Sequence, residues 1–322
     1  MIKGFKYLAY VAGMIIGFAS YSNDTHSIEE QANLAIKQLY NKSPDISMTS
    51  RIDWFSAQFK DAPYLLGSLG EGPDAPYDQF PRYRVDVFDC DTFVNTVVSL
   101  ALANSLTGFQ QCINLNRYKD GKVSYINRNH FTGLDWNINN QQRGVLKDIT
   151  LDIKDEQNRP VALMAQAVIN KSSWYAHKTL ADIRLQNNDP QEQKQRLEEL
   201  KAEGAPLGST PSSLPYLPFT ALFTKEKPNL YLFSQIPQGA IIEIVRPNWN
   251  LSDEIGTNLN VSHLGFAIWE KGTLYFRQAS SEYKKVVDVP LIDYLHNATK
   301  SPTIKGINVQ ILVPQKPLAH CS

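Results

Sequence analysis

The two ends of the sequence carry different hydrophobic periodicities, and this contrast sets the class of fold. Helices are predicted where apolar residues recur at helical spacing, in residues 27–39, 52–59 and 92–104. Strands are predicted later in the chain, in residues 241–245, 261–269, 273–279 and 307–313. Helices followed by a set of antiparallel strands predict an α+β fold.

The middle of the sequence, from about Cys112 to Leu230, is the least periodic part. It contains one predicted charged helix, which begins at Asp189-Pro190 and ends at Gly204. The next stretch, residues 206–218, is rich in Pro and Ser, so we expect a surface connection there. We expect a single domain over residues 23–322, with a helical insertion at about 105–230.

The N-terminus has the features of an export signal. Lys3 and Lys6 precede an uncharged apolar run over residues 7–19, and small residues follow this run. The run is short for a membrane span, and an uncleaved anchor helix is the alternative to a signal peptide. We expect a signal peptide over residues 1–22 and a mature protein in the periplasm or outside the cell, with no stable membrane insertion after signal removal.

Composition excludes some classes of function. Lys+Arg and Asp+Glu number 32 each, so the formal net charge is 0, whereas a nucleic-acid surface needs clustered basic charge. No nucleic-acid partner is therefore expected. A zinc amidase would need about three ligands, but none of the 6 histidines forms a pair at ligand spacing. We expect no metal and no cofactor.

Cys90 stands at the predicted start of an apolar helix, in the stretch FDCDTF of residues 88–93. Asp89 is a suitable N-cap residue, which places Cys90 in the first turn, where the helix dipole stabilises an anion by roughly 0.3–1 kcal/mol. The flanking carboxylates of Asp89 and Asp91 oppose ionisation of the thiol. A nearby imidazolium would therefore have to supply the remaining stabilisation of the thiolate. A buried or disulfide-bonded Cys90 is the alternative interpretation.

His263 stands near the start of a predicted strand, in the stretch VSHLGFA of residues 261–267. Alternation along the strand puts Gly265 and Ala267 on the same face as His263. These small residues leave room for another backbone, and we expect the helix that begins at Cys90 to pack there. A histidine with only a structural hydrogen bond is the alternative.

Gln278 lies on the next predicted strand. A hairpin with an even loop centred on Glu270 and Lys271 sets Gln278 opposite His263, whereas an odd loop would shift this register. The side-chain oxygen of Gln278 could then accept a hydrogen bond from one imidazole nitrogen and leave the other facing the thiol. An ordinary exposed strand residue is the alternative.

Taken in order, these motifs resemble a known family. The Asp-Cys helix start, the stretch SHLG of residues 262–265 and a polar residue before Ala-Ser on the next strand are similar to NlpC-type papain-like cell-wall peptidases. The stretches APYLLGSLGEG of residues 62–72, DCDTFV of residues 89–94 and HF with DW in residues 130–136 resemble one branch, the N-acetylmuramoyl-L-alanine amidase-like family. The resemblance runs from about residue 51 to the C-terminus.

The resemblance implies a papain-like core, in which a nucleophile helix packs on an antiparallel sheet and insertions enlarge the domain. It implies Cys90 as nucleophile, His263 as general base, Gln278 as the third polar residue and Tyr64 as a hydroxyl near the oxyanion. Many relatives carry His where Gln278 stands. Gln278 can orient the base but cannot titrate, so the site would have one fewer ionisable group.

The activity implied is hydrolysis of the bond between N-acetylmuramic acid and L-alanine in peptidoglycan fragments, the muropeptides. A D-glutamyl-diaminopimelate endopeptidase of the same fold and a non-catalytic wall-binding protein are the alternatives. Arg82, Arg84 and Arg277 are candidates for holding a peptide carboxylate, with a solvated surface role as the default. If Cys90 stays free, the intramolecular disulfide left to the three cysteines joins Cys112 to Cys321.

Overall fold

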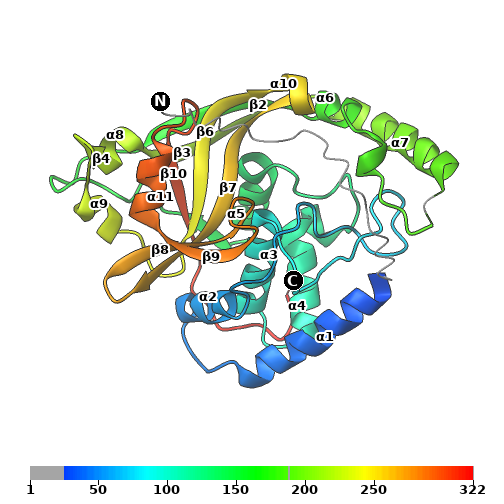
Figure 1. The fold of residues 1–322 in the computed structure, drawn as a ribbon, viewed down its shortest axis with the longest axis horizontal. Coiled ribbons are helices and arrows are strands. Elements are labelled where there is room, and N and C mark those ends of the chain that lie inside the picture. Colours follow the sequence, from blue (N-terminus) through cyan, green and yellow to red (C-terminus); the bar gives the residue numbers. More distant parts are fainter. Residues whose placement is uncertain (1–24, 188, 322) are drawn as a thin grey trace, which may run out of the picture.

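The computed structural model describes residues 25–187 and 189–321, and the expected signal peptide lies outside them. The described chain has mixed α and β structure around one large antiparallel sheet (Figure 1). Among the described residues, no helix is both long and apolar enough to span a membrane.

The helices lie mainly before and between the strands of this sheet. In chain order they are α1 (Thr25–Lys42), α2 (Met48–Ala57), α3 (Cys90–Leu102), α4 (Leu106–Arg117), η1 (Lys119–Gly121), η2 (Thr132–Trp136), α5 (Asn137–Gln142), α6 (Lys171–Ala176), η3 (Leu180–Asp182), α7 (Pro190–Gly204), η4 (Ala205–Leu207), α8 (Phe219–Leu222), α9 (Leu230–Ser234), α10 (Ser252–Ile255) and α11 (Leu291–Ala298).

The strands of the large sheet run in the order β2-β3-β10-β6-β7-β8-β9, and β1 pairs with β10. Their bounds are β1 (Leu146–Asp148), β2 (Leu163–Asn170), β3 (Ser209–Pro218), β6 (Ile241–Leu251), β7 (Thr257–Glu270), β8 (Thr273–Ser280), β9 (Lys285–Pro290) and β10 (Gly306–Leu312). A separate pair consists of β4 (Phe223–Thr224) and β5 (Lys227–Pro228). The α+β class predicted from the sequence is therefore confirmed.

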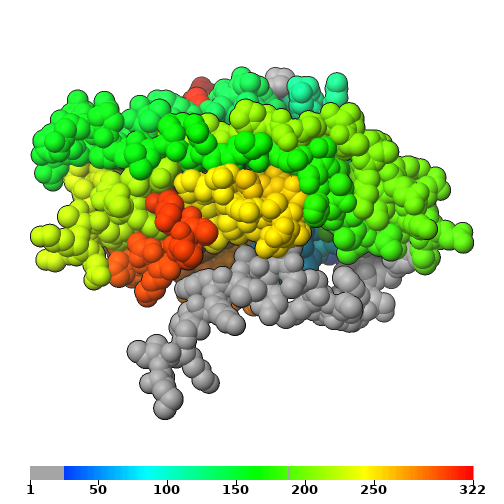
Figure 2. Space-filling view, turned by 90° about the horizontal axis from the view of Figure 1, so that it is seen from above, coloured from blue at the N-terminus to red at the C-terminus, as the bar shows by residue number. Residues whose placement is uncertain are grey.

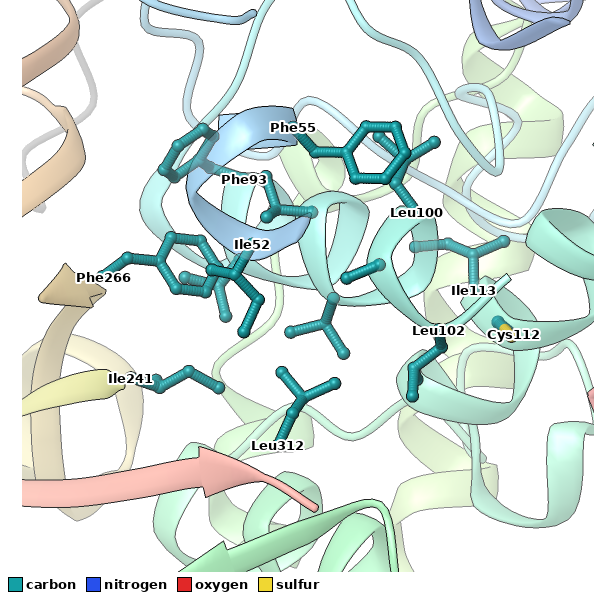
Figure 3. Close-up of a cluster of buried hydrophobic side chains, with 14 of the residues drawn as sticks. Ile52, Phe55, Phe93, Leu100, Leu102, Cys112, Ile113, Ile241, Phe266 and Leu312 are labelled. Carbon is teal, nitrogen blue, oxygen red and sulfur yellow. The ribbon is translucent and has the colours of Figure 1, made fainter. Parts of the chain in front are cut away.

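The sheet carries an apolar core on each face. On one face, side chains from α2, α3 and α4 pack against those of β6, β7 and β10 (Figure 3). Phe93 of α3 meets Phe266 of β7 with ring centroids 5.7 Å apart. On the other face, α9 and α11 pack against residues of β6, β7 and β8, including Ile242, Ala267 and Phe276. This two-sided covering explains why the central strands are apolar on both faces.

The middle of the chain is less helical than the sequence indicated. The segment of residues 105–230 supplies β1, β2 and β3, which extend the main sheet beyond β10. The predicted surface connection at residues 206–218 is wrong, because most of it forms β3, which pairs with β2 from Ser209 to Tyr216 and with β10 at Leu217 and Pro218. Strand β2 also lies against β6 and β7, and Figure 2 shows its green residues beside the yellow ones of these strands.

Two further sequence predictions concern single residues, and both are confirmed. Helix α7 begins after the N-cap Asp189, whose side chain accepts from the N–H of Gln191 at 2.9 Å. Cys112 of α4 is bonded to Cys321, which ties the C-terminal segment to the helix layer, while Cys90 is free.

Candidate functional site

Cys90 is the first residue of α3, as the sequence predicted. Asp89 is the N-cap, and its Oδ1 accepts from the N–H of Thr92 at 2.8 Å. In return, the N–H of Asp89 donates to Thr92 Oγ1 at 2.9 Å, so the capping box is complete. The thiol is therefore held in the first helical turn, where it is half-buried.

The loop before α3 is tied to this first turn. The N–H of Gly67 donates to Asp89 Oδ2 at 2.7 Å, and Gly67 has a φ of +66°, which favours glycine. Ser68 Oγ and Thr92 Oγ1 lie 2.9 Å apart. Both oxygens of Asp89 thus hold backbone N–H groups, and this carboxylate has a structural role.

Tyr64 lies beside the segment that leads into Cys90. It forms a parallel bridge with Phe88, and the N–H of Leu65 donates to Phe88 O at 2.9 Å. Burial, followed by the charges of Cys90 and Asp89, raises the pKa of the Tyr64 hydroxyl. The phenol therefore stays protonated near neutral pH and can donate a hydrogen bond.

His263 and Gln278 are joined by a hydrogen bond, because His263 Nε2 donates to Gln278 Oε1. The register differs from the predicted one. The β7–β8 hairpin pairs Phe266 with Arg277 and Glu270 with Thr273, so its even loop is centred one residue later than expected. Gln278 consequently stands next to Gly265, and His263 reaches it diagonally.

Helix α3 packs on the other face of β7 from the one that the sequence predicted. Leu264 and Phe266 share the core with α3, whereas Ala267 belongs to the core on the opposite face. The absence of a side chain at Gly265 makes room for residues of β8 and not for α3. A Cβ at this position would lie 2.7 Å from Phe276 and 3.1 Å from the Cβ of Gln278. The small residue makes room for side chains of β8 instead of a helix.

Cys90 lies beside the segment of β7 that carries His263, but the thiol and the imidazole are not joined. The backbone N–H of Leu264, the neighbour of His263, interacts with the Cys90 thiol, and the Asp89 charge acts on the His263 imidazole. Across the described residues, no hydrogen bond links the thiol to the imidazole ring. Hydrogen bonds between catalytic groups often tighten only when substrate is bound.

The environment keeps both groups neutral. Burial, then the charges of Asp89 and Asp91, raises the pKa of the Cys90 thiol above its usual value. Burial lowers the pKa of His263 to about 4, against the opposing effects of Gln278 and Asp89. The resting state is therefore a thiol beside a neutral imidazole. The thiolate–imidazolium pair that the sequence suggested is disfavoured by burial of both groups and, at Cys90, by the charges of Asp89 and Asp91 as well.

The three candidate arginines already have carboxylate partners. Arg277 is 4% exposed and pairs with Asp53 at 2.9 Å and Asp288 at 2.6 Å. Arg82 pairs with Glu29, and Arg84 pairs with Asp86. Arg277 is thus a structural residue of the sheet. The described ranges also contain no group of three or more His, Cys, Asp or Glu residues placed to hold a metal ion.

A cavity that sequence reasoning did not predict lies beside the first turn of α3. Arg117, Arg128 and Asn129 help to line it, and none of them was singled out in the sequence. Asp91, His130 and Trp136 also line it, and these three belong to the motifs quoted above. The sequence did contain one signal for this cavity: Asp91, His130 and Trp136 belong to the motifs shared with the family, yet no role in the site had been assigned to them.

Comparisons with known proteins agree with this fold. A family model described as AmiA-like, N-acetylmuramoyl-L-alanine amidase-like, matches residues 54–304, and the chain belongs to this family. A crystal structure of a Legionella pneumophila str. Philadelphia 1 protein is 62% identical, with a TM-score of 0.90 over 92% of this chain and 100% of that one. An N-acetylmuramoyl-L-alanine amidase from Bacteroides uniformis is 25% identical, with a TM-score of 0.55 over 82% and 98% of the two chains. No curated protein matches the chain.

Proposed function

We propose that the protein is a cysteine amidase that hydrolyses the bond between N-acetylmuramic acid and L-alanine in muropeptides. The observation that carries this proposal is the hydrogen bond from His263 to Gln278 beside the free thiol of Cys90. A carbonyl oxygen can only accept, so this bond places the imidazole proton on Nε2 and leaves Nδ1 as a base. Membership of the amidase-like family supports the choice of reaction.

The reaction divides into acylation and hydrolysis. The thiol proton of Cys90 passes to His263 Nδ1 as the sulfur attacks the lactyl carbonyl carbon. The C–N bond then breaks, and the imidazolium returns the proton to the amine of L-alanine, which leaves with the peptide. Water, deprotonated by His263, cleaves the thioester, which releases the lactyl carboxylate and restores the thiol. Because the resting groups are neutral, proton transfer accompanies attack.

Tyr64 is proposed to stabilise the oxyanion of the tetrahedral intermediate. Its hydroxyl is kept protonated, and it lies close enough to Cys90 for the thiolate charge to raise its pKa. A neutral hydrogen-bond donor aimed at the developing charge is the usual means of such stabilisation.

We also propose that the core is papain-like and of the NlpC type, and that the protein acts in the periplasm or outside the cell. A helix that begins at the nucleophile and packs on an antiparallel sheet supports the first proposal. The Cys112–Cys321 disulfide supports the second, because disulfides persist mainly in oxidising compartments.

The test is mass spectrometry of digests of a purified disaccharide-tetrapeptide. Release of intact disaccharide and free tetrapeptide is expected, and Cys90→Ser should abolish it. Release of a disaccharide still bearing L-alanine and D-glutamate would show an endopeptidase. Binding without any cleavage by the wild-type protein would show a wall-binding module.

A further inference from the structure

Arg184 follows η3 in the middle of the chain and is joined to the loop before α3. Its N–H donates to Tyr77 O at 2.9 Å, and its carbonyl oxygen accepts from the N–H of Gln79 at 2.8 Å, which makes a parallel bridge with Asp78. The guanidinium also lies over the ring of Phe80, 3.8 Å from the centroid. The loop therefore holds both the backbone and the side chain of Arg184 in place.

The guanidinium of Arg184 closes the turn that follows Tyr64. Its Nη1 donates to Gly67 O, and its Nη2 donates to Leu69 O at 3.0 Å. Nη2 also pairs with Asp78, which is 1% exposed. A Cβ at Gly67 would lie 3.3 Å from Arg184 Nη1, so the approach is close. A planar fork of donors can bind two carbonyls and a carboxylate at once, which an ammonium group cannot do with the same geometry.

This turn is bonded in its turn to the residue before the nucleophile. The N–H of Gly67 donates to Asp89 Oδ2, and Asp89 is the N-cap of the helix that Cys90 begins. Gly67 thus connects Arg184, at its carbonyl, with Asp89, at its amide. Tyr64 belongs to the same loop and lies three residues before Gly67. A displacement of Gly67 would therefore reach both the thiol and the phenol.

Neutralising Asp78 does not by itself require Arg184. The guanidinium of Arg128 also pairs with Asp78, at 2.8 Å, and the Arg128 side chain hydrogen-bonds only to carboxylates in the described chain. The two bonds to the carbonyls of the turn are what Arg184 adds. Its distinct contribution is therefore to the shape of the loop, and the charge of Asp78 is secondary.

We propose that Arg184 is a positioning residue for the reaction at Cys90. Its guanidinium fixes the turn at Gly67, and this turn holds the Asp89 cap of α3. Through the same turn, it sets the position of the Tyr64 phenol relative to the thiol. The inference rests on the proposed function, because that reaction needs the nucleophile and the oxyanion donor at a fixed separation. Arg184 acts through Gly67 and Asp89, so it should affect kcat and leave KM unchanged.

The kinetic test follows the release of L-alanine from N-acetylmuramoyl-L-alanine. Arg184→Gln removes the fork and should lower kcat at least ~10-fold, with KM within ~2-fold of the wild type. Arg184→Lys keeps the charge without the fork and should also lose most of kcat. An unchanged kcat in Arg184→Gln, or a loss that appears only as a raised KM, would overturn the proposal. Wild-type kcat in Arg184→Lys would show that the charge suffices, and would overturn the clamp.

Arg159→Gln is the matched control. Arg159 belongs to the same middle part of the chain, its side chain is 70% exposed, and it pairs with Asp155 at 2.7 Å. This change also removes an arginine–carboxylate pair, but it should leave kcat and KM unchanged. Circular dichroism and thermal unfolding identify a temperature at which every variant is folded, and the rates are measured there.

A double-mutant cycle separates positioning from a general structural effect. Asp89→Asn keeps an oxygen for the N–H of Thr92 but places an amide donor where Gly67 now finds an acceptor. The path from Arg184 is then already broken. In this background Arg184→Gln should lower kcat by at most ~3-fold. The same loss in both backgrounds would mean that Arg184 does not act through Asp89.

Hydrogen exchange tests the clamp without any catalysis. The amide hydrogen of Gly67 is protected by Asp89, so mass spectrometry of fragments that isolate residue 67 should show exchange at least ~10-fold faster in Arg184→Gln and Arg184→Lys. Arg159→Gln should exchange like the wild type. Unchanged exchange in the Arg184 variants would overturn the inference whatever the reaction is. If no amide were cleaved but this exchange pattern held, the proposed reaction would fail and the clamp on the loop would stand.

Discussion

The imidazole of His263 on β7 donates to the side-chain carbonyl of Gln278 on β8 from a diagonal position. This relationship decides the tautomer of the proposed base, because the shared proton must sit on Nε2. The amide group of Gln278 cannot titrate, and Gln278 is only 2% exposed. The orientation of the imidazole should therefore be independent of pH, whereas a carboxylate or second histidine at this position would vary with it.

The first prediction concerns this hydrogen bond. Gln278→Ala should keep the fold and lower kcat/KM by about 10–100-fold, since the base loses the partner that orients it. Gln278→His should retain part of the activity, because an imidazole nitrogen can also accept from Nε2. The measurement is the rate of L-alanine release from N-acetylmuramoyl-L-alanine, with circular dichroism to confirm folding. Full activity in the Ala variant would remove Gln278 from the site.

The second prediction concerns the acid limb of the pH profile. The base must be neutral, and burial lowers the pKa of His263 to about 4, so kcat/KM should fall only as the pH drops through this value. Gln278→Glu places a carboxylate beside the ring and should move the limb to higher pH by about 1–2 units. A wild-type limb near the ordinary histidine pKa of about 6.5 would contradict the neutral resting pair.

The third prediction concerns the reactivity of Cys90. Because the pKa of its thiol is raised, iodoacetamide should alkylate it more slowly at pH 8 than a free exposed cysteine, for which the pKa is about 8.5. Asp91→Asn removes one of the charges that oppose ionisation and should increase the rate several-fold. Asp86→Asn should not. Alkylation in the wild-type protein faster than that of a model peptide would show a stabilised thiolate instead.

The fold class and the elements that carry Cys90 and His263 could be predicted from local sequence. Asp89 and Thr92 carry the N-cap signal within four residues of chain, and the strand around His263 has a clear period of two. These signals need no knowledge of distant contacts, which is why the start of α3 and the positions of β7 and β8 in the chain were predicted, whereas the predicted register of their hairpin was one residue off.

Features that depend on pairing across the chain could not be predicted. Strand β3 contains Pro211 and Pro215, residues that usually mark a loop, and its strand conformation follows from pairing with β2. Arg277 looked like a free cation, but its partner Asp53 lies on α2, more than two hundred residues away in sequence. The cavity was missed for the same reason, since Arg117 and Arg128 reach the first turn of α3 only in the folded chain.

The fourth prediction concerns the disulfide. Cys112 is fully buried in α4, and its bond to Cys321 closes a loop with a sequence separation of 209 residues. Cys321→Ser should lower the free energy of unfolding by about 2–4 kcal/mol, because the unfolded chain gains freedom. Urea unfolding with and without reductant checks this, and reductant should not affect the Ser variant. Since Cys90 stays free, muropeptide cleavage should persist below the unfolding transition.

The last prediction concerns Glu243 of β6, which is fully buried between amide side chains. Its Oε2 accepts from Asn137 Nδ2 at 3.1 Å and its Oε1 from Gln310 Nε2 at 3.3 Å, while burial raises the pKa of this carboxyl to about 8. In the unfolded chain the carboxyl loses its proton near pH 4.5, and in the folded chain only near 8. The unfolded state therefore binds fewer protons between these values, so the protein should lose stability as the pH rises through this window, by at most about 1.4 kcal/mol per pH unit.

Glu243→Gln removes the titrating group and keeps its shape, so it should flatten this pH dependence and be the more stable protein at pH 8. Glu270→Gln, an exposed change at the end of β7, serves as the control and should follow the wild-type curve. Urea unfolding of the three proteins at several pH values between 5 and 9 makes the comparison. Parallel curves for wild type and Glu243→Gln would mean that Glu243 is ionised in the folded protein, and its amide neighbours would then stabilise a buried charge.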